Sequence, residues 1–96
     1  MEPWKKKDHL EVCADVLQAC NPSPALTSTI LLHANLRGRR WKRYRALLTN
    51  RGLLEASMWR MDITYQTTEK GRHFLNLFGE LRRLLEEPGT WEVCNP

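Results

Sequence analysis

Acidic side chains are missing from the middle of this 96-residue sequence. No Asp or Glu occurs between Asp15 and Glu55, although the chain contains eleven acidic residues in all. The net charge is +4, and many of the fifteen Lys and Arg residues gather in and around this acid-free stretch. A surface that only had to be soluble would mix both signs of charge. The distribution therefore indicates a surface that attracts an anionic partner such as a nucleic acid.

Long apolar runs are missing too. No stretch approaches the roughly 20 apolar residues that a membrane-spanning helix needs. The N-terminal residues are charged, whereas a secretory signal has an apolar core. We therefore expect a cytoplasmic protein that has no membrane partner.

Motifs for catalysis, cofactors and metals are not found. The three His and three Cys residues do not form the two close pairs that structural zinc requires. His9 and Cys13 share a helix face, but two ligands alone do not make a zinc site. The sequence has no Gly-rich phosphate loop and no Gly-x-Ser-x-Gly elbow. We expect no metal, no cofactor and no enzymatic activity.

Residues 36–52 carry the strongest pattern in the chain. At 100° per residue, one side of a helix here is apolar and faces a core, with Trp41, Tyr44, Leu47 and Leu48. The opposite side is polar and carries Arg39, Lys42, Arg43, Ala46 and Asn50. Gly52 is placed to end the helix just after its C-cap. The pattern predicts an amphipathic helix over residues 37–51 with a cationic exposed face.

A cationic helix face of this kind is typical of helices that enter the major groove of DNA. The candidates for reading base edges are Arg39, Lys42, Arg43 and Ala46. The candidates for phosphate contacts are Lys6, Lys7, Thr27, Ser28, Arg37, Arg40, Arg45, Asn50 and Arg51. Two alternatives stay open, because Thr27 and Ser28 also suit helix capping and a charge run is often only a solvated face.

Two shorter helices are predicted before the basic one. Residues 8–19 have helical apolar spacing, with Asp8 as N-cap and Glu11 three residues later. The prolines in residues 21–24 end this helix. A second helix over residues 27–34, capped by Thr27, offers Leu26, Ile30, Leu31 and Ala34 to the core. A four-residue turn containing Gly38 then gives the helix-turn-helix pattern.

After the basic helix, residues 53–59 and 63–67 read as two short strands joined by a turn at residues 60–62. They predict a β-hairpin, or wing, although no Asn-Gly or Asp-Gly pair marks the turn. Arg60 at its tip is a candidate for contact with a minor groove or a phosphate, and exposure to solvent is an equal alternative.

The last helix is predicted over residues 69–87, capped by Thr68 and stopped by Pro88-Gly89. Its apolar residues, spaced as in a coiled-coil seam with a flank, are Phe74, Leu77, Phe78, Leu81, Leu84 and Leu85. At 1.5 Å per residue the helix is about 28 Å long, more than so small a domain needs for its own core. We expect a homodimer through these residues. The alternative is that all six serve the core of their own chain.

In order and spacing, these elements resemble the archaeal winged-helix DNA-binding proteins. That family includes small regulators, crenarchaeal virus proteins and a chromosomal DNA-binding protein with a C-terminal coiled coil. The resemblance spans about residues 5–85. It is carried by residues 6–12, Ala34-Asn35-Leu36, Tyr44 with Leu47-Leu48, Gly52-Leu53-Leu54, and most specifically Tyr65-Gln66-Thr67-Thr68-Glu69-Lys70-Gly71.

The resemblance implies three helices, a wing and a dimerising fourth helix, with the third helix in the major groove. It also implies an archaeal or archaeal-virus source, and hence a nucleoid or host-cytoplasm location. Relatives from hot environments tolerate intracellular disulfides, so Cys94 is a candidate bridge between subunits, with a free thiol as the alternative. The chain departs from the family pattern in its helix start, Arg37-Gly38, and in its short last helix.

The expected fold is therefore mainly α with a small β-hairpin (α+β), a winged helix-turn-helix with a C-terminal dimerisation helix. We divide the chain into a basic arm (1–7), the winged-helix domain (8–67), the dimerisation helix (68–87) and a tail (88–96).

The leading functional hypothesis is sequence-specific binding of double-stranded DNA by a homodimeric transcriptional regulator. The second is an architectural, chromatin-like protein that holds phosphates without choosing a sequence. The third is a winged-helix protein-interaction module, with Trp91 and Val93 as anchors. The acid-free stretch argues against the third, and nothing in the sequence separates the first two.

Overall fold

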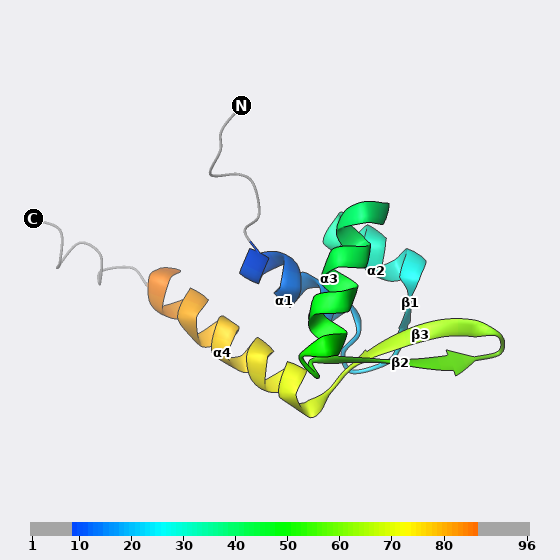
Figure 1. The fold of residues 1–96 in the computed structure, drawn as a ribbon. Helices are drawn as coiled ribbons and strands as arrows, with labels where there is room; N and C mark the ends of the chain where they lie inside the picture. Colours follow the sequence, from blue (N-terminus) through cyan, green and yellow to red (C-terminus); the bar gives the residue numbers. More distant parts are fainter. Residues whose placement is uncertain (1–8, 87–96) are drawn as a thin grey trace, which may run out of the picture.

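The computed structural model of the chain describes residues 9–86. Its elements in order are α1 (His9–Ala19), β1 (Ala25–Leu26), α2 (Thr27–Ala34), α3 (Gly38–Asn50), β2 (Leu54–Trp59), β3 (Asp62–Thr67) and α4 (Glu69–Glu86). The strands form an antiparallel sheet in the order β1-β3-β2. In Figure 1, α1, α2 and α3 lie above the β2–β3 hairpin, which projects to one side while α4 runs off to the other.

The predicted fold class is confirmed, and the hairpin forms with only Arg60 and Met61 in its turn. β1 was not predicted from the sequence. This strand is two residues long and pairs Ala25 with Tyr65 and Leu26 with Thr64. A segment this short has no periodicity that could mark it as a strand.

Two expectations at the start of α2 were wrong. The N-cap is Leu26 rather than Thr27, and no side chain caps this end of the helix. Leu26 was also expected in the core, but 41% of its surface is exposed. Its strand pairing explains this, because neighbouring strand residues point to opposite faces and Ala25 takes the buried one.

The core lies between α1, α2, α3 and one face of the sheet. Its largest fully buried side chains include Leu17, Ile30, Leu48 and Leu54. Cys13 and Cys20 are buried free thiols. Burial raises the pKa of both, that of Cys20 to about 12, so these cysteines act as small apolar core residues at neutral pH.

The segment from Thr67 to Gly71 fixes the base of α4. The Thr67 hydroxyl donates to the Leu17 carbonyl (2.6 Å). The Thr68 hydroxyl donates to the Gly52 carbonyl (2.6 Å) and accepts from the Gly71 backbone N–H (3.1 Å), so Thr68 caps α4 as predicted. A Cβ on Gly71 would overlap the Leu53 carbonyl oxygen. This close approach explains why the Thr-Glu-Lys-Gly segment ends in glycine. Asp8, the predicted N-cap of α1, lies outside the described residues.

A candidate nucleic-acid interface

The apolar side of α3 fastens the helix to the domain. Trp41, Tyr44 and Leu48 are all buried, as the spacing predicted. The Trp41 ring meets the Tyr65 ring of β3 edge-on, with centroids 5.3 Å apart. Tyr44 shares a 2.7 Å hydrogen bond between its hydroxyl and Nδ1 of His9 in α1. Contacts with two different elements therefore set the orientation of α3.

The two ends of α3 differ in how they are held. At the C-terminus, Gly52 has φ +75°, its N–H donates to the Thr49 carbonyl (3.1 Å), and the Leu53 N–H donates to the Leu48 carbonyl (2.9 Å). This is a Schellman motif, as Gly52 predicted. Lys70 of α4 donates to the Arg51 carbonyl (2.7 Å) and helps to hold this end. At the N-terminus, Arg37 is the cap and makes no side-chain cap bond.

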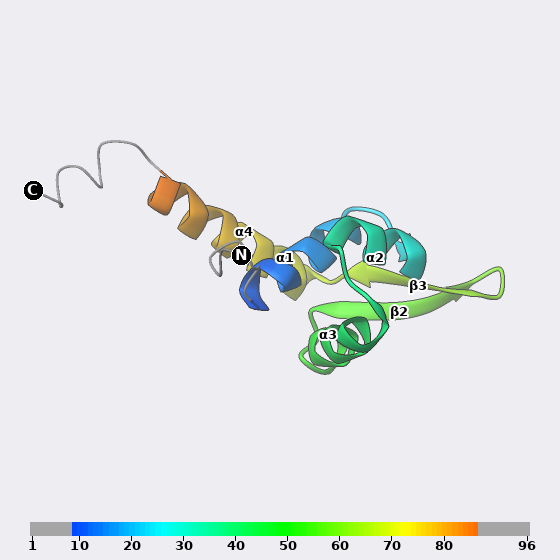
Figure 2. The same cartoon turned by 90° about the horizontal axis from the view of Figure 1, so that it is seen from above.

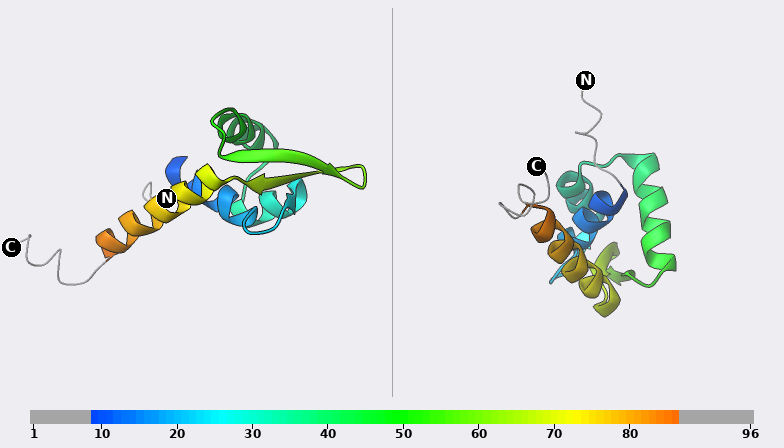
Figure 3. Two further views of the ribbon diagram at one scale, coloured as in Figure 1. Left: turned by 90° about the horizontal axis from the view of Figure 1, so that it is seen from below. Right: turned by 90° about the vertical axis from the view of Figure 1, so that its left-hand side faces the viewer.

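The outward side of α3 is exposed, and in Figure 3 (right) the helix stands at the outer edge of the domain. The exposed members of this surface, which we call the α3 face, are Arg39, Arg40, Lys42, Arg43, Ala46 and Asn50. Arg45 is half-buried beside the groove between α3 and β2. Leu47 differs from its expected place in the core stripe, because 37% of its surface is exposed at the border of the α3 face. The structure thus brings together all four predicted base-reading residues.

The predicted phosphate contacts are distributed over several elements. Arg37 and Arg51 are exposed at the two caps of α3. At the start of α2, Ser28 is exposed and Thr27 is half-buried. The remaining candidates, Lys6 and Lys7, lie outside the described residues, as do Cys94, Trp91 and Val93.

The hairpin ends in a two-residue turn with positive φ at both Arg60 (50°) and Met61 (71°), as type I′ turns require. The Arg60 guanidinium carbon lies 4.6 Å from the centre of the Trp59 ring. Only Arg60 was predicted from the sequence as a contact residue here, and the exposed apolar side chains around it were not predicted. The available signal was the concentration of Met, Trp and Ile in a segment that forms little of the core.

α4 uses its apolar side chains in two ways. Phe74 and Leu75, near its base, pack against the core, and Phe78 stacks on Phe74 with ring centroids 6.2 Å apart. Farther along, the exposed apolar residues are Leu77, Leu81, Leu84 and Leu85. The alternative that all six predicted residues serve their own core is therefore wrong. Phe74, which the spacing assigns to the dimer seam, is partly buried and packs against the core.

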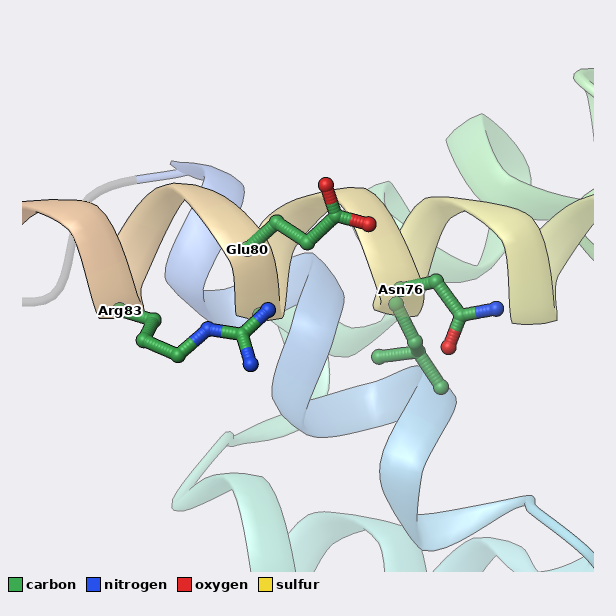
Figure 4. A pocket seen from close by; sticks show the side chains of 5 residues that line it. Asn76, Glu80 and Arg83 are labelled. Carbon is green, nitrogen blue, oxygen red and sulfur yellow. The ribbon is translucent and has the colours of Figure 1, made fainter.

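The remaining surface of α4 is polar and mixes its charges. In Figure 4, Asn76, Glu80 and Arg83 follow one another along the helix beside an open hollow that Leu75 and Gly79 also line. The described residues contain no group of three or more side chains able to hold a metal ion. No described helix is long and apolar enough to cross a membrane.

Comparison with known proteins identifies this arrangement. A family model described as winged helix-turn-helix matches residues 6–86. The chain belongs to the winged helix-turn-helix family. Among solved structures, this winged helix-turn-helix chain is similar to Sso10a-2, a DNA-binding protein from Sulfolobus solfataricus, with a TM-score of 0.75 and 21% identity over 83% of each chain. No curated protein matches the sequence. The family and fold expected from the sequence are both confirmed.

Proposed function

We propose that this winged-helix protein binds double-stranded DNA sequence-specifically as a homodimeric transcriptional regulator. The α3 face is the observation that supports this most strongly. α3 carries five Lys and Arg residues and no acidic residue, and four of these cations are exposed on the α3 face. A polyanion such as a DNA duplex suits a rigid helix whose first two turns carry closely spaced cations.

In this proposal α3 lies in the major groove, which is wide enough to admit an α-helix. Arg39, Lys42 and Arg43 read base edges, and the arginines prefer guanine, which accepts two hydrogen bonds from a guanidinium group. Ala46 lies among these long side chains, and its small size lets the helix backbone approach the bases.

Phosphate contacts position the protein on the duplex. Arg40, Arg45, Asn50 and the cap residues Arg37 and Arg51 lie beside the base-reading residues, where the walls of the groove pass. Further phosphate contacts are assigned to Lys6, Lys7, Thr27 and Ser28.

The homodimer part of the proposal is supported by the outer half of α4. Its leucines recur at coiled-coil spacing and remain exposed, with 49% of Leu77, 57% of Leu81 and 63% of Leu84 accessible. A second copy of α4 would cover them and set two α3 helices on one duplex. Half-sites about 10 bp apart, or a multiple of that, would form an inverted repeat. Such a dimer would act in the cytoplasm, at the nucleoid.

The test is a binding titration of the full chain against DNA from around its own gene and against scrambled DNA of equal length, at several salt concentrations. A preference of about 10³-fold or more for its own DNA at physiological salt supports the regulator. Equal affinities with a steep salt dependence would instead support architectural binding. No binding at low salt would contradict the proposal and favour a protein-interaction module.

A further inference from the structure

The tip of the wing has a composition unlike that of the α3 face. Four apolar residues here are exposed, namely Met58, Trp59, Met61 and Ile63, and 91% of Met61 is accessible. The charged residues of the segment are Arg60 and Asp62, whose charges cancel. A wing that only contacted phosphates would gain from a net positive charge. The tip therefore offers apolar surface, with one guanidinium group beside it.

The backbone of the turn is held in a conformation that its residues disfavour. Arg60 and Met61 both have positive φ, a region in which type I′ turns normally use Gly, Asn or Asp. Strained backbone that persists in a folded protein is concentrated at functional sites. Six consecutive residue pairs, from Leu54↔Thr67 to Trp59↔Asp62, connect the turn to the core. The hairpin is thus a continuous ribbon that presents Met61 at its end.

The hairpin is placed to meet the duplex that α3 would hold. In Figure 1, α3 and the hairpin run crosswise, and β2 starts beside the C-terminal end of α3. Figure 2 shows the same hairpin projecting well beyond α3 to one side. A duplex whose major groove holds α3 has its next minor groove to the side of this helix, in the direction in which the hairpin projects.

We propose that Met61 is an apolar wedge that enters the minor groove and partly unstacks one base step, so that binding bends the DNA. Arg60, its neighbour in the turn, would guide it through attraction to the groove. Minor-groove proteins that insert Met, Leu, Ile, Phe or Pro in this way kink DNA by roughly 20 to 90°. This inference rests on the proposed function, because it needs the α3 face to bind the duplex.

The experiment measures end-to-end energy transfer in a duplex that the protein binds in the titration, with a donor and an acceptor dye at its two ends. Met61→Gly removes the wedge, and glycine adopts the positive φ of this turn without strain, so this variant keeps the hairpin. Met61→Leu keeps an apolar side chain. Leu32→Ala is the matched control, because it shortens an exposed apolar side chain in α2, outside the wing.

At saturating protein, we expect the wild type, Met61→Leu and Leu32→Ala to raise energy transfer by similar amounts, and Met61→Gly to lose most of that rise. 2-Aminopurine, moved through the adenine positions, should brighten where the step unstacks, and this signal should also disappear in Met61→Gly. If the wild type bound DNA without bending it, or if Met61→Gly bent DNA like the wild type, the proposal that Met61 is a wedge would be wrong. Either result would favour a protein partner for the apolar wing tip. If the wild type bound no DNA, the proposed function itself would have failed.

Discussion

α3 and α4 are both amphipathic helices, but the core buries the apolar side of α3 and only the first part of the apolar side of α4. In α3 the apolar side is buried by Tyr65 and the core, and the exposed side is cationic over the first two turns, from Arg39 to Arg43. In α4 only the base is packed, and the outer half exposes leucines next to side chains of both charges, such as Glu80 and Arg83. In the proposed function the two helices therefore have different partners, an anion for α3 and another apolar surface for α4.

The largest expected effect tests whether the two apolar sides differ in their contribution to folding. Leu48→Ala in α3 should lower the free energy of unfolding by about 2 to 5 kcal/mol, because it opens a cavity in the core. Leu81→Ala in α4 should change it by less than about 0.5 kcal/mol when measured on dilute, monomeric protein. Urea denaturation followed by circular dichroism gives both values. Equal losses would show that the outer half of α4 packs on its own chain.

The next prediction tests association through α4. Leu81→Glu should raise the dimer dissociation constant by about ten- to a hundredfold, because an unpaired carboxylate would be buried at the seam. Analytical ultracentrifugation measures this constant, with Asn76→Glu on the polar side as the matched control. A wild-type chain that stayed monomeric at high concentration would contradict the proposed homodimer.

On the α3 side, Arg43→Ala should cost about 1 to 3 kcal/mol of binding free energy on a cognate site and relax its base preference. Lys6→Ala should weaken binding to all sequences alike. Arg83→Ala removes the same charge from α4 and should leave specificity unchanged. Fluorescence anisotropy with cognate and scrambled duplexes checks all three. Equal losses on both duplexes for Arg43→Ala would remove Arg43 from the base-reading set.

The smallest expected effect is that of Gly79 in α4, and Gly71 of the same helix provides the contrast. Gly79 has no atom within 4 Å of an added Cβ, so Gly79→Ala should stabilise the protein by about 0.5 to 1 kcal/mol through its higher helix propensity. Gly71→Ala should destabilise it, because the added Cβ would overlap the Leu53 carbonyl oxygen. Thermal unfolding of the two variants gives the signs. A stabilising Gly71→Ala would mean that α4 is not seated on the end of α3.

Sequence reasoning predicted the features that repeat along the chain. Trp41, Tyr44 and Leu48 recur at helical spacing, and Gly52 and Thr68 have local roles that depend on few distant residues. β1 was missed because two residues form a strand only when β3 lies alongside. The exposure of Leu26 depends on the same pairing, which no local pattern encodes.

The candidate site also contains one part that the sequence predicts and one part that it does not. The composition of the α3 face could be read from the sequence, since helical periodicity separates its cations from the buried stripe. The exposed apolar wing tip could not be predicted, because the sequence pattern of two strands does not show how far their hairpin extends beyond the core. Nor does spacing alone separate Phe74 from Leu81. They share one stripe of α4, and only the position at which α1 and the core end decides which of them is covered.

The most direct test of the central claim, that α3 and not α4 meets DNA, is an NMR titration of the ¹⁵N-labelled chain with a short duplex. The account predicts that the largest amide shifts occur at Arg39, Arg43 and Ala46, with further shifts at the wing tip and little change from Leu77 to Leu85. Shifts concentrated in α4, with α3 unaffected, would contradict it.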